Sequence, residues 1–535
     1  MNKLLIELLF LFSFLITYSQ KPGYYFVWFK DKANNSFTLS KPYEFLSERT
    51  IKKRLLYNIY FDSLDLPVSN FYINQIENNG AYFHSASKWL NGGIFKIIDS
   101  IIYYNISNLP FVKKITYLKP LTTEAKIFNK EELYIKNNLL YGCAENQIKM
   151  LKGDFLHNLG FTGDSILIAV LDAGFLNANK ISQFKHLFDN EKIKLTRNII
   201  KGGYSTEVFD YHFHGTMVLS IIASQEEGKY IGSAPNADFV LLLTEDAYTE
   251  YLFEEYCWVI GAEIADSIGA DIINSSLGYT IFDDPSQNHT WQDLDGKTAV
   301  ASIAANICAR KGILVVSSAG NLRQTNWIKI SVPADADSIL TVGAVDSLGN
   351  LAPFSSTGNT ADGRIKPTIV AQGYHACCIN TEGEQINCSG TSFSAPLISG
   401  LSACLWQPFK DSINNIDIYN VIIKSSNKYY NPDSLYGYGL PNFQLAFYML
   451  SSIKKNNMNY PVLMKNPVKD KFYVKFPNTN SIKSISIYNI YGKVMYNENF
   501  FENFLIIDIS HFSCGIYFVS ITIEEKIYNY KIIKL

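Results

Sequence analysis

The sequence lacks the features that would place it in several large functional classes. Its 47 basic and 49 acidic residues give a formal net charge of −2, and no long block carries charge of one sign. The basic signature of a nucleic-acid-binding protein is therefore missing. Beyond the N-terminus no run of about eighteen uncharged apolar residues occurs, so we expect no transmembrane segment in the mature chain. Hydrophobic residues make up 47% of the chain and can build a sizeable core.

The N-terminus has the pattern of a signal peptide. Lys3 precedes an apolar segment over residues 4–16 that only Glu7 and Ser13 interrupt. Such a segment is too short to favour a helix that spans a membrane. We expect residues 1–19 to be a signal peptide that exports the chain to the periplasm. An N-terminal membrane anchor is the alternative.

A serine on a tight turn is the first sign of chemistry. The run Ser389-Gly390-Thr391-Ser392 leads into an apolar helical segment over residues 397–405. Glycine lets the backbone approach a ligand closely, and the first turn of a helix has unpaired N–H groups. Taken alone, the pattern fits an ordinary serine N-cap equally well.

Three more polar residues stand at the ends of expected elements. Asp172 follows an apolar strand, His214 opens an apolar helix, and Asn321 follows a second apolar strand. Each could be a turn cap, a core histidine or a loop amide. In an alternating α/β chain, however, ligands bind outside the carboxyl ends of the strands. Together with Ser392, these residues offer an acid, a base, an oxyanion donor and a nucleophile at that edge.

The chain order Asp, His, Asn, Ser resembles that of the subtilisin-like serine peptidases. Ser276-Leu277-Gly278 looks like the substrate-binding strand of that family, and residues 333–358 look like its later core segment. The resemblance implies an α/β fold, a parallel sheet with helices on both faces, which we place at residues 121–450. One departure is Ala371-Gln372-Gly373, where the family commonly has Ala-Pro-Gly.

The resemblance gives each matched residue a role in acyl transfer. Ser392 would attack the scissile carbonyl while His214 takes its proton, and Asp172 would fix the imidazole tautomer. The Asn321 amide would hold the oxyanion, and the segment 276–278 would pair with substrate backbone as an added strand. These roles predict a secreted serine endopeptidase that acts on proteins or peptides. A catalytically silent subtilase fold that serves as a surface-binding protein is the alternative.

Two other kinds of site fit the sequence less well. His212 and His214 form a His-x-His pair, but no spaced cysteine or carboxylate set accompanies it, so we expect no metal site there. An α/β-hydrolase elbow would need glycine where Ser394 stands, and its serine would come first in the chain. The predicted chemistry requires no cofactor. Structural calcium, which is frequent in the resembled family, is left open.

The region before the peptidase domain resembles the prosegments of secreted subtilases. Residues 20–120 contain short β-rich runs and a basic helical stretch around residues 48–56, which indicate a small α+β unit. In that family the prosegment assists folding and blocks the active site until it is removed. An accessory binding domain that stays attached is the alternative.

The C-terminal region has a different sequence pattern from the regions before it. Short strands and turn signals over residues 458–535 predict a small β-sandwich. The runs Asn466-Pro467-Val468 and Gly515-Ile516-Tyr517 resemble the C-terminal sorting domain of type IX secretion in Bacteroidetes. This resemblance implies the type IX machinery as a partner and a secreted or cell-surface location. A carbohydrate- or protein-binding β-domain is the alternative.

Eight cysteines allow disulfides in an oxidising compartment. We expect Cys377 or Cys378 to pair with Cys388, because the residues between them can fold as a hairpin. Such a bridge would brace the loop that leads to Ser392. The alternative is that the three cysteines in apolar helical patterns are plain buried thiols: Cys257, Cys308 and Cys404.

Overall fold

The structure is a computed structural model of the 535-residue chain. It describes residues 21–121, 141–203, 205–456, 461–464, 467–476, 483–501, 504–523 and 526–535. The predicted signal peptide lies outside the described residues. The chain divides into two compact units, Met1–Leu450 and Ser451–Leu535. Among the described helices, none has the length and apolar character needed to cross a membrane.

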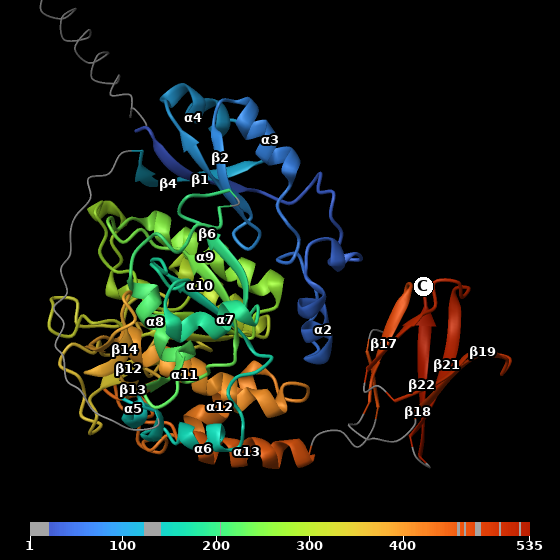
Figure 1. The fold of residues 1–535 in the computed structure, drawn as a ribbon. Helices are drawn as coiled ribbons and strands as arrows, with labels where there is room; N and C mark the ends of the chain where they lie inside the picture. The colour runs from blue at the N-terminus through green and yellow to red at the C-terminus, as the bar shows by residue number, and fades with distance from the viewer. Residues whose placement is uncertain are drawn as a thin grey trace, which may run out of the picture. The chain divides into compact units, whose positions relative to one another are not determined.

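The first part of unit 1 is an N-terminal subdomain built on an antiparallel sheet in the order β2-β3-β1-β4 (Figure 1). Side chains of a strand alternate between its two faces. Tyr25, Val27 and Phe29 therefore pack in the core of the subdomain, whereas Phe26 packs in the core of the neighbouring domain. The elements are β1 (Gly23–Phe29), α2 (Glu48–Leu56), α3 (Asn70–Asn78), β2 (Tyr82–Ser87), β3 (Gly92–Ile97), α4 (Ser100–Ser107) and β4 (Val112–Pro120).

The rest of unit 1 is organised around a parallel sheet of seven strands in the order β13-β12-β11-β10-β5-β9-β6. The strands that form its centre are apolar runs buried along their whole length, as expected for a sheet covered on both faces. Its strands are β5 (Leu167–Asp172), β6 (Ile193–Asn198), β9 (Asp238–Leu243), β10 (Ile272–Ser275), β11 (Leu314–Ser318), β12 (Leu340–Val345) and β13 (Ile369–Gln372).

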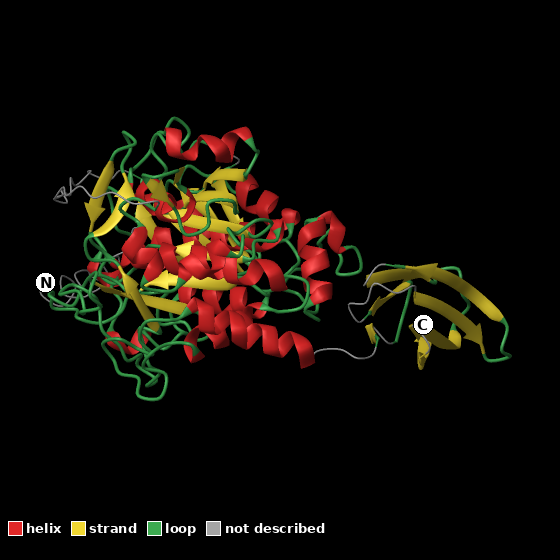
Figure 2. Ribbon diagram, turned by 60° about the horizontal axis from the view of Figure 1, so that its bottom comes forward, coloured by secondary structure: helices red, strands yellow, loops and turns green. Residues whose placement is uncertain are grey.

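Helices cover both faces of this sheet (Figures 1 and 2). Helices α9 and α10 pack together against the face that presents Leu167, Ala169 and Leu171, and α8 and α11 pack together against the sheet from the other side. The predicted α/β architecture is therefore present. The helices of this domain are α5 (Glu145–Lys149), α6 (Gly153–Asn158), α7 (Lys185–Asp189), α8 (His214–Ala223), α9 (Leu252–Ile268), α10 (Val300–Arg310), α11 (Thr391–Trp406), α12 (Asn415–Lys424) and α13 (Phe443–Asn456).

The second unit contains two antiparallel sheets that share one apolar core. The first sheet has the order β16-β17-β20 and the second the order β19-β18-β21-β22. The sandwich predicted from the alternating pattern is thus observed. Its strands are β16 (Val462–Met464), β17 (Lys471–Lys475), β18 (Lys483–Asn489), β19 (Val494–Phe500), β20 (Phe504–Asp508), β21 (Gly515–Ile523) and β22 (Lys526–Lys534).

The disulfide differs from the predicted one, although the predicted hairpin forms from β14 (Ala376–Ile379) and β15 (Gln385–Cys388). Cys377 bonds Cys143, with the Cα atoms 5.7 Å apart. Cys388 stands opposite Ala376, so its side chain and that of Cys377 point to opposite faces of the hairpin. Cys378 is only a diagonal neighbour of Cys388, and diagonal neighbours are about 7–8 Å apart, too far for a disulfide.

For three cysteines the alternative, plain buried thiols, is correct. Cys257, Cys308 and Cys404 are buried thiols in helices α9, α10 and α11. The observed bridge joins residues 234 positions apart, and nothing in the local pattern pointed to Cys143. It ties the start of the α/β domain to the hairpin that leads to Ser392.

Candidate active site

The acid and base candidates meet where strand β5 ends and helix α8 begins. His214 Nδ1 lies 2.7 Å from Asp172 Oδ1, and the backbone N–H of Ala173 donates to the same oxygen at 2.8 Å. A carboxylate oxygen only accepts, so the proton of this pair belongs on Nδ1. That tautomer leaves Nε2 with its lone pair, as a general base requires. Asp172 is fully buried and His214 is 8% exposed.

A glycine permits this close approach. A Cβ atom on Gly215 would lie 2.3 Å from the Gly174 carbonyl oxygen and 2.9 Å from Cβ of Asp172. Helix α8 can therefore start directly against the end of β5 only if glycine follows His214. This explains the His-Gly sequence in physical terms.

Ser392 is the second residue of helix α11 and is 7% exposed. Its Oγ donates to the carbonyl oxygen of Ser276 at 3.2 Å, and the Ser276 hydroxyl donates to the Ser392 carbonyl at 2.9 Å. The Ser392 carbonyl is available because Pro396, four residues on, has no N–H to offer it. The serine is thereby fastened to the end of strand β10.

The serine and histidine belong to the same corner of the molecule but are not joined by a described hydrogen bond. The His214 ring lies 5.9 Å, centroid to centroid, from Phe393, the residue next to Ser392. The Ser392 hydroxyl bonds Ser276 in this structure. Catalytic hydrogen bonds are often formed only once substrate is bound. A rotation of the Ser392 side chain would release it from the Ser276 carbonyl.

Asn321 lies beside the turn that carries the serine. Its Oδ1 accepts from the backbone N–H of Thr391 at 2.8 Å and from the Thr391 hydroxyl at 2.9 Å. Both of these bonds use the oxygen, so the amide nitrogen is directed to the space over Gly390. A Cβ atom on Gly390 would lie 3.3 Å from that nitrogen. The amide is thus oriented as a donor next to the Ser392 backbone.

The predicted substrate strand continues from β10. Ser276 and Leu277 are buried, whereas Gly278 is exposed. Tyr279 exchanges backbone hydrogen bonds with Val332 at 2.9 and 3.1 Å, which holds one side of the segment. A Cβ atom on Gly278 would lie 2.1 Å from Ser331 Oγ, so glycine is required there.

Gln372, the departure from the resembled family, has structural contacts. Its Oε1 accepts from Asn146 at 2.8 Å, and its Nε2 donates to the His375 carbonyl at 3.3 Å. These bonds connect helix α5 with the approach to the β14–β15 hairpin. Among the described residues, no group of three or more His, Cys, Asp or Glu side chains is placed to hold a metal ion.

The N-terminal subdomain covers helix α9. Tyr24 and Phe26 of β1 pack on Phe253 and Tyr256 of α9, with ring centroids 5.3 and 4.7 Å apart. Glu263, further along α9, accepts from the Ser87 hydroxyl at 2.6 Å and from the backbone N–H groups of the next two residues at 2.9 and 3.0 Å. An apolar face and a carboxylate therefore anchor the subdomain together.

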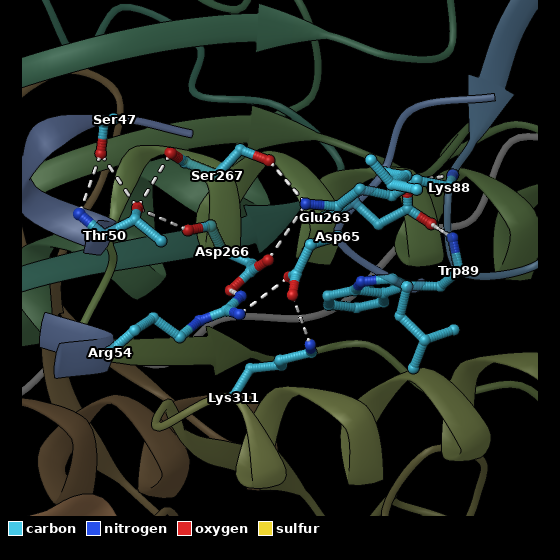
Figure 3. Close-up of polar contacts among 12 residues, drawn as sticks. Ser47, Thr50, Arg54, Asp65, Lys88, Trp89, Glu263, Asp266, Ser267 and Lys311 are labelled. Atoms are coloured by element: carbon cyan, nitrogen blue, oxygen red, sulfur yellow. Dashed lines mark hydrogen bonds and ion pairs between the residues drawn. The ribbon is translucent and has the colours of Figure 1, made fainter. Parts of the chain in front are cut away.

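A second set of contacts, which we call the Arg54 network, consists of Arg54, Asp65, Lys88, Asp266 and Lys311 (Figure 3). Arg54 lies 2.8 Å from Asp65 and 2.7 Å from Asp266, and all three side chains are fully buried. Lys88 lies 3.1 Å from Asp266, and Lys311 lies 2.9 Å from Asp65. Burial would raise the pKa of Asp266, but Lys88 and Arg54 outweigh it and lower the pKa to about 2.

The comparison with known proteins identifies the family. The family model for the subtilase family matches residues 163–439, which is about half of the chain. The chain belongs to the subtilase family. A model for the Bacteroidota propeptide domain of peptidase S8 matches residues 24–132, and a model for a secretion system C-terminal sorting domain matches residues 460–535. We therefore call the N-terminal subdomain the prosegment and unit 2 the sorting domain.

Curated relatives agree with this membership. The chain is 26% identical over 330 residues to the membrane-bound transcription factor site-1 protease of Rattus norvegicus, covering 59% of this chain but only 28% of that protein. It is 29% identical over 300 residues to subtilisin BL of Lederbergia lenta, covering 56% of this chain and 97% of that one. The crystal structure of MycP1 from Mycobacterium smegmatis aligns with a TM-score of 0.46 at 19% identity, over 61% of this chain and 89% of that chain.

The sequence reasoning missed two groups of charged residues. One is the Arg54 network, whose members are scattered between residues 54 and 311. The other lies where strand β9 leads into helix α9, and its signal was visible as acidic residues crowded into positions 245–255. A search of the sequence for many carboxylates and few cations in a short segment would have identified it.

Proposed function

We propose that this subtilase is a serine endopeptidase that hydrolyses peptide bonds through an acyl-enzyme. The observation that carries the proposal is the buried Asp172–His214 pair, at 2.7 Å, at the same edge of the sheet as Ser392 and Asn321. The acid, the base, the nucleophile and the oxyanion donor come from the end of β5, the start of α8, the start of α11 and the end of β11. This is the constellation that acyl transfer needs.

The roles follow from the contacts. His214 Nε2 would take the Ser392 proton as Oγ attacks the scissile carbonyl carbon, and would then deliver it to the leaving amine. Asp172, which already holds Nδ1–H, would stabilise the imidazolium. The Asn321 amide nitrogen and the Ser392 backbone N–H would stabilise the oxyanion. Water would then hydrolyse the acyl-enzyme with the same proton relay in reverse.

The flanking domains fit an exported zymogen. The prosegment holds helix α9 through a large apolar and charged interface, so the enzyme would be delivered with its prosegment in place. The sorting domain would direct the chain to the type IX secretion machinery and thus to the cell surface or the medium. The predicted signal peptide would first carry it to the periplasm.

A second candidate function, a binding protein with a silent site, is favoured by one observation. The described hydrogen bond of the Ser392 hydroxyl goes to Ser276, and not to His214. A serine that stays in this position would have no base to activate it. The reactivity of Ser392 therefore decides between the two candidates.

Labelling with a fluorophosphonate separates them. This reagent phosphonylates a serine that a base activates, with loss of fluoride, so the processed protein should be labelled and Ser392→Ala should not be. Ser394→Ala is the matched control, because Ser394 lies two residues further along helix α11 and its hydroxyl donates to the Thr391 carbonyl. Equal labelling of the parent and Ser394→Ala, with none in Ser392→Ala, supports the peptidase. A folded, processed parent that stays unlabelled would support the binding protein.

A further inference from the structure

A group of carboxylates lies between strand β9 and helix α9, and we call it the Glu254 cluster. The backbone N–H of Glu250 donates to Asp283 Oδ2 at 3.2 Å, and the backbone N–H of Tyr251 donates to Glu254 Oε1 at 3.2 Å. These contacts fold the β9–α9 connection against the loop after Tyr279. The cluster consists of Glu245, Asp246, Glu250, Glu254 and Asp283.

Two buried polar atoms at this cluster have no hydrogen-bond partner among the described residues. Glu254 is fully buried, and while its Oε1 caps helix α9, its Oε2 is unsatisfied. The hydroxyl of Tyr279 is also fully buried and unsatisfied. A buried carboxylate without a cation is strongly disfavoured, and normally it is paired or protonated.

The charges of these groups act on one another. Burial and the neighbouring charges of Glu250 and Glu245 hold the pKa of Glu254 well above its ordinary range. Burial and the charges of Glu245 and Glu254 likewise raise the pKa of the Tyr279 hydroxyl. A cation placed among them would favour the ionised carboxylates and remove the penalty.

The prosegment brings a cation to the edge of this cluster. Lys119, near the end of strand β4, places its Nζ 3.3 Å from Asp246 Oδ2 and 4.7 Å from the centre of the Phe253 ring. The carbonyl of Leu118 accepts from Gln287 at 2.9 Å, which fixes the strand. When the prosegment leaves, Lys119 leaves with it.

Lys119 also indicates the direction of a bound chain. Strand β4 ends at Pro120, and the described part of the peptidase domain starts at Tyr141. We expect the cut that frees the prosegment to fall between them, which would place Lys119 N-terminal to the bond that is cut. A substrate that follows the same course would place residues N-terminal to its scissile bond beside the cluster.

The cluster is also close to the catalytic residues. Thr244, which precedes Glu245, donates its backbone N–H to the Asp172 carbonyl at 3.0 Å. Tyr279 directly follows the segment Ser276-Leu277-Gly278 that we expect to pair with substrate. The cluster therefore adjoins the segment that we expect to hold the substrate.

We propose that the Glu254 cluster is a subsite for a lysine or arginine side chain of the substrate, N-terminal to the scissile bond, in the place that Lys119 approaches in the zymogen. This inference rests on the proposed peptidase function and names the substrate class of that site. The enzyme would thus prefer peptides with a basic side chain at this position, although its hydrogen bonds to the substrate backbone do not depend on the substrate sequence.

The test is a cleavage profile of the processed enzyme on matched peptides that carry lysine or glutamine at each position N-terminal to the bond. At one position lysine should raise kcat/KM about 30-fold or more, as expected for a desolvated charge pair. Glu254→Gln keeps the cap on Tyr251 and should reduce this preference to a few-fold. Asp246→Asn, at a partly exposed site, should weaken it in the same direction if Glu254→Gln fails to fold.

Asp189→Asn is the matched control, because Asp189 is an exposed carboxylate paired with Lys185 on helix α7. It should keep the parent's preference. Cleavage with no preference for lysine at any position would overturn the subsite while the peptidase stands. A preference that survives in both Glu254→Gln and Asp246→Asn would also overturn it.

Peptide binding makes the test independent of turnover. The affinity of labelled lysine and glutamine peptides is measured by fluorescence polarisation on protein blocked with fluorophosphonate, or on the untreated protein if it does not turn over. Tighter binding of the lysine peptide that is lost in Glu254→Gln supports the subsite even if the enzyme is silent. Equal binding of both peptides, with Ca²⁺ stabilising the parent but not Glu254→Gln, would assign the cluster to a metal ion instead.

Discussion

The Arg54 network and the Glu254 cluster are both built from carboxylates on or beside helix α9, yet their charge balance is opposite. In the Arg54 network each carboxylate has a cation within about 3 Å, and Arg54 bridges two of them. In the Glu254 cluster one buried carboxylate oxygen has no partner among the described residues, and the cation at its edge comes from the prosegment. The balanced group holds two domains together, and the unbalanced group is suited to bind a ligand.

Replacing Arg54 should have the largest effect on the stability of the zymogen. Arg54→Ala would leave Asp65 and Asp266 buried beside a cavity, so we expect the free energy of unfolding of the zymogen to fall by about 3–5 kcal/mol. Urea unfolding of the full chain in a Ser392→Ala background measures this. Arg49→Ala is the control, because Arg49 lies on the same helix but is a third exposed and pairs with Asp271. Equal losses in both variants would contradict the account.

The effect of pH on prosegment binding should be of intermediate size. The pKa of Asp266 is lowered from 3.8 to about 2 in the complex, so its contribution is complete above about pH 4 and is lost as the pH falls through about 2. Burial raises the pKa of Glu263, so protonation of this group in the complex does not oppose binding as the pH falls. Burial lowers the pKa of His84, whose ring packs on Phe253, so protonation of His84 opposes binding as the pH falls below its ordinary pKa of 6.5. The cleaved prosegment should therefore co-elute with the enzyme on size-exclusion chromatography at pH 8 and be held more weakly at pH 5. Equal retention at both pH values would contradict this role of His84.

The smallest effect should be at Lys119. Lys119 is 9% exposed, and its Nζ lies 3.3 Å from Asp246 and over the Phe253 ring, so Lys119→Ala should weaken the hold of the prosegment by about 1–2 kcal/mol, less than Arg54→Ala. The same urea experiment measures it beside Arg54→Ala. A loss as large as that of Arg54→Ala would mean that the Glu254 cluster is part of the anchor and not a site left open for substrate.

The fold was predictable from the sequence because each signal was local. The apolar run that ends at Asp172 is long enough to identify a buried strand, and the glycines after His214 and before Thr391 mark where chain segments come within contact. The chain order of the polar residues at strand ends then indicated the family. For these residues, local pattern and tertiary position agree.

The features that were missed depend on pairs far apart in the chain. Cys143 and Cys377 are 234 residues apart, and Arg54 meets Asp266 across 212 residues. Nothing near either residue in the sequence indicates its partner. The predicted pairing of Cys377 or Cys378 with Cys388 was wrong, because Cys377 and Cys388 point to opposite faces of the hairpin and Cys378 is only a diagonal neighbour of Cys388. Whether two cysteines on neighbouring strands can form a disulfide depends on the register of the strands as well as on their distance in the sequence.

The central claim is tested most directly by casein hydrolysis with the processed protein beside Ser392→Ala. In subtilisin, a member of the same family, removing the triad serine lowers kcat by about 10⁶, so hydrolysis by the variant should fall to background. N-terminal sequencing of both proteins shows whether the prosegment was removed, and the variant can be processed in trans by the parent. Casein hydrolysis by the parent that disappears in Ser392→Ala is the predicted result. Equal hydrolysis by both proteins would contradict the assignment of Ser392 as the nucleophile.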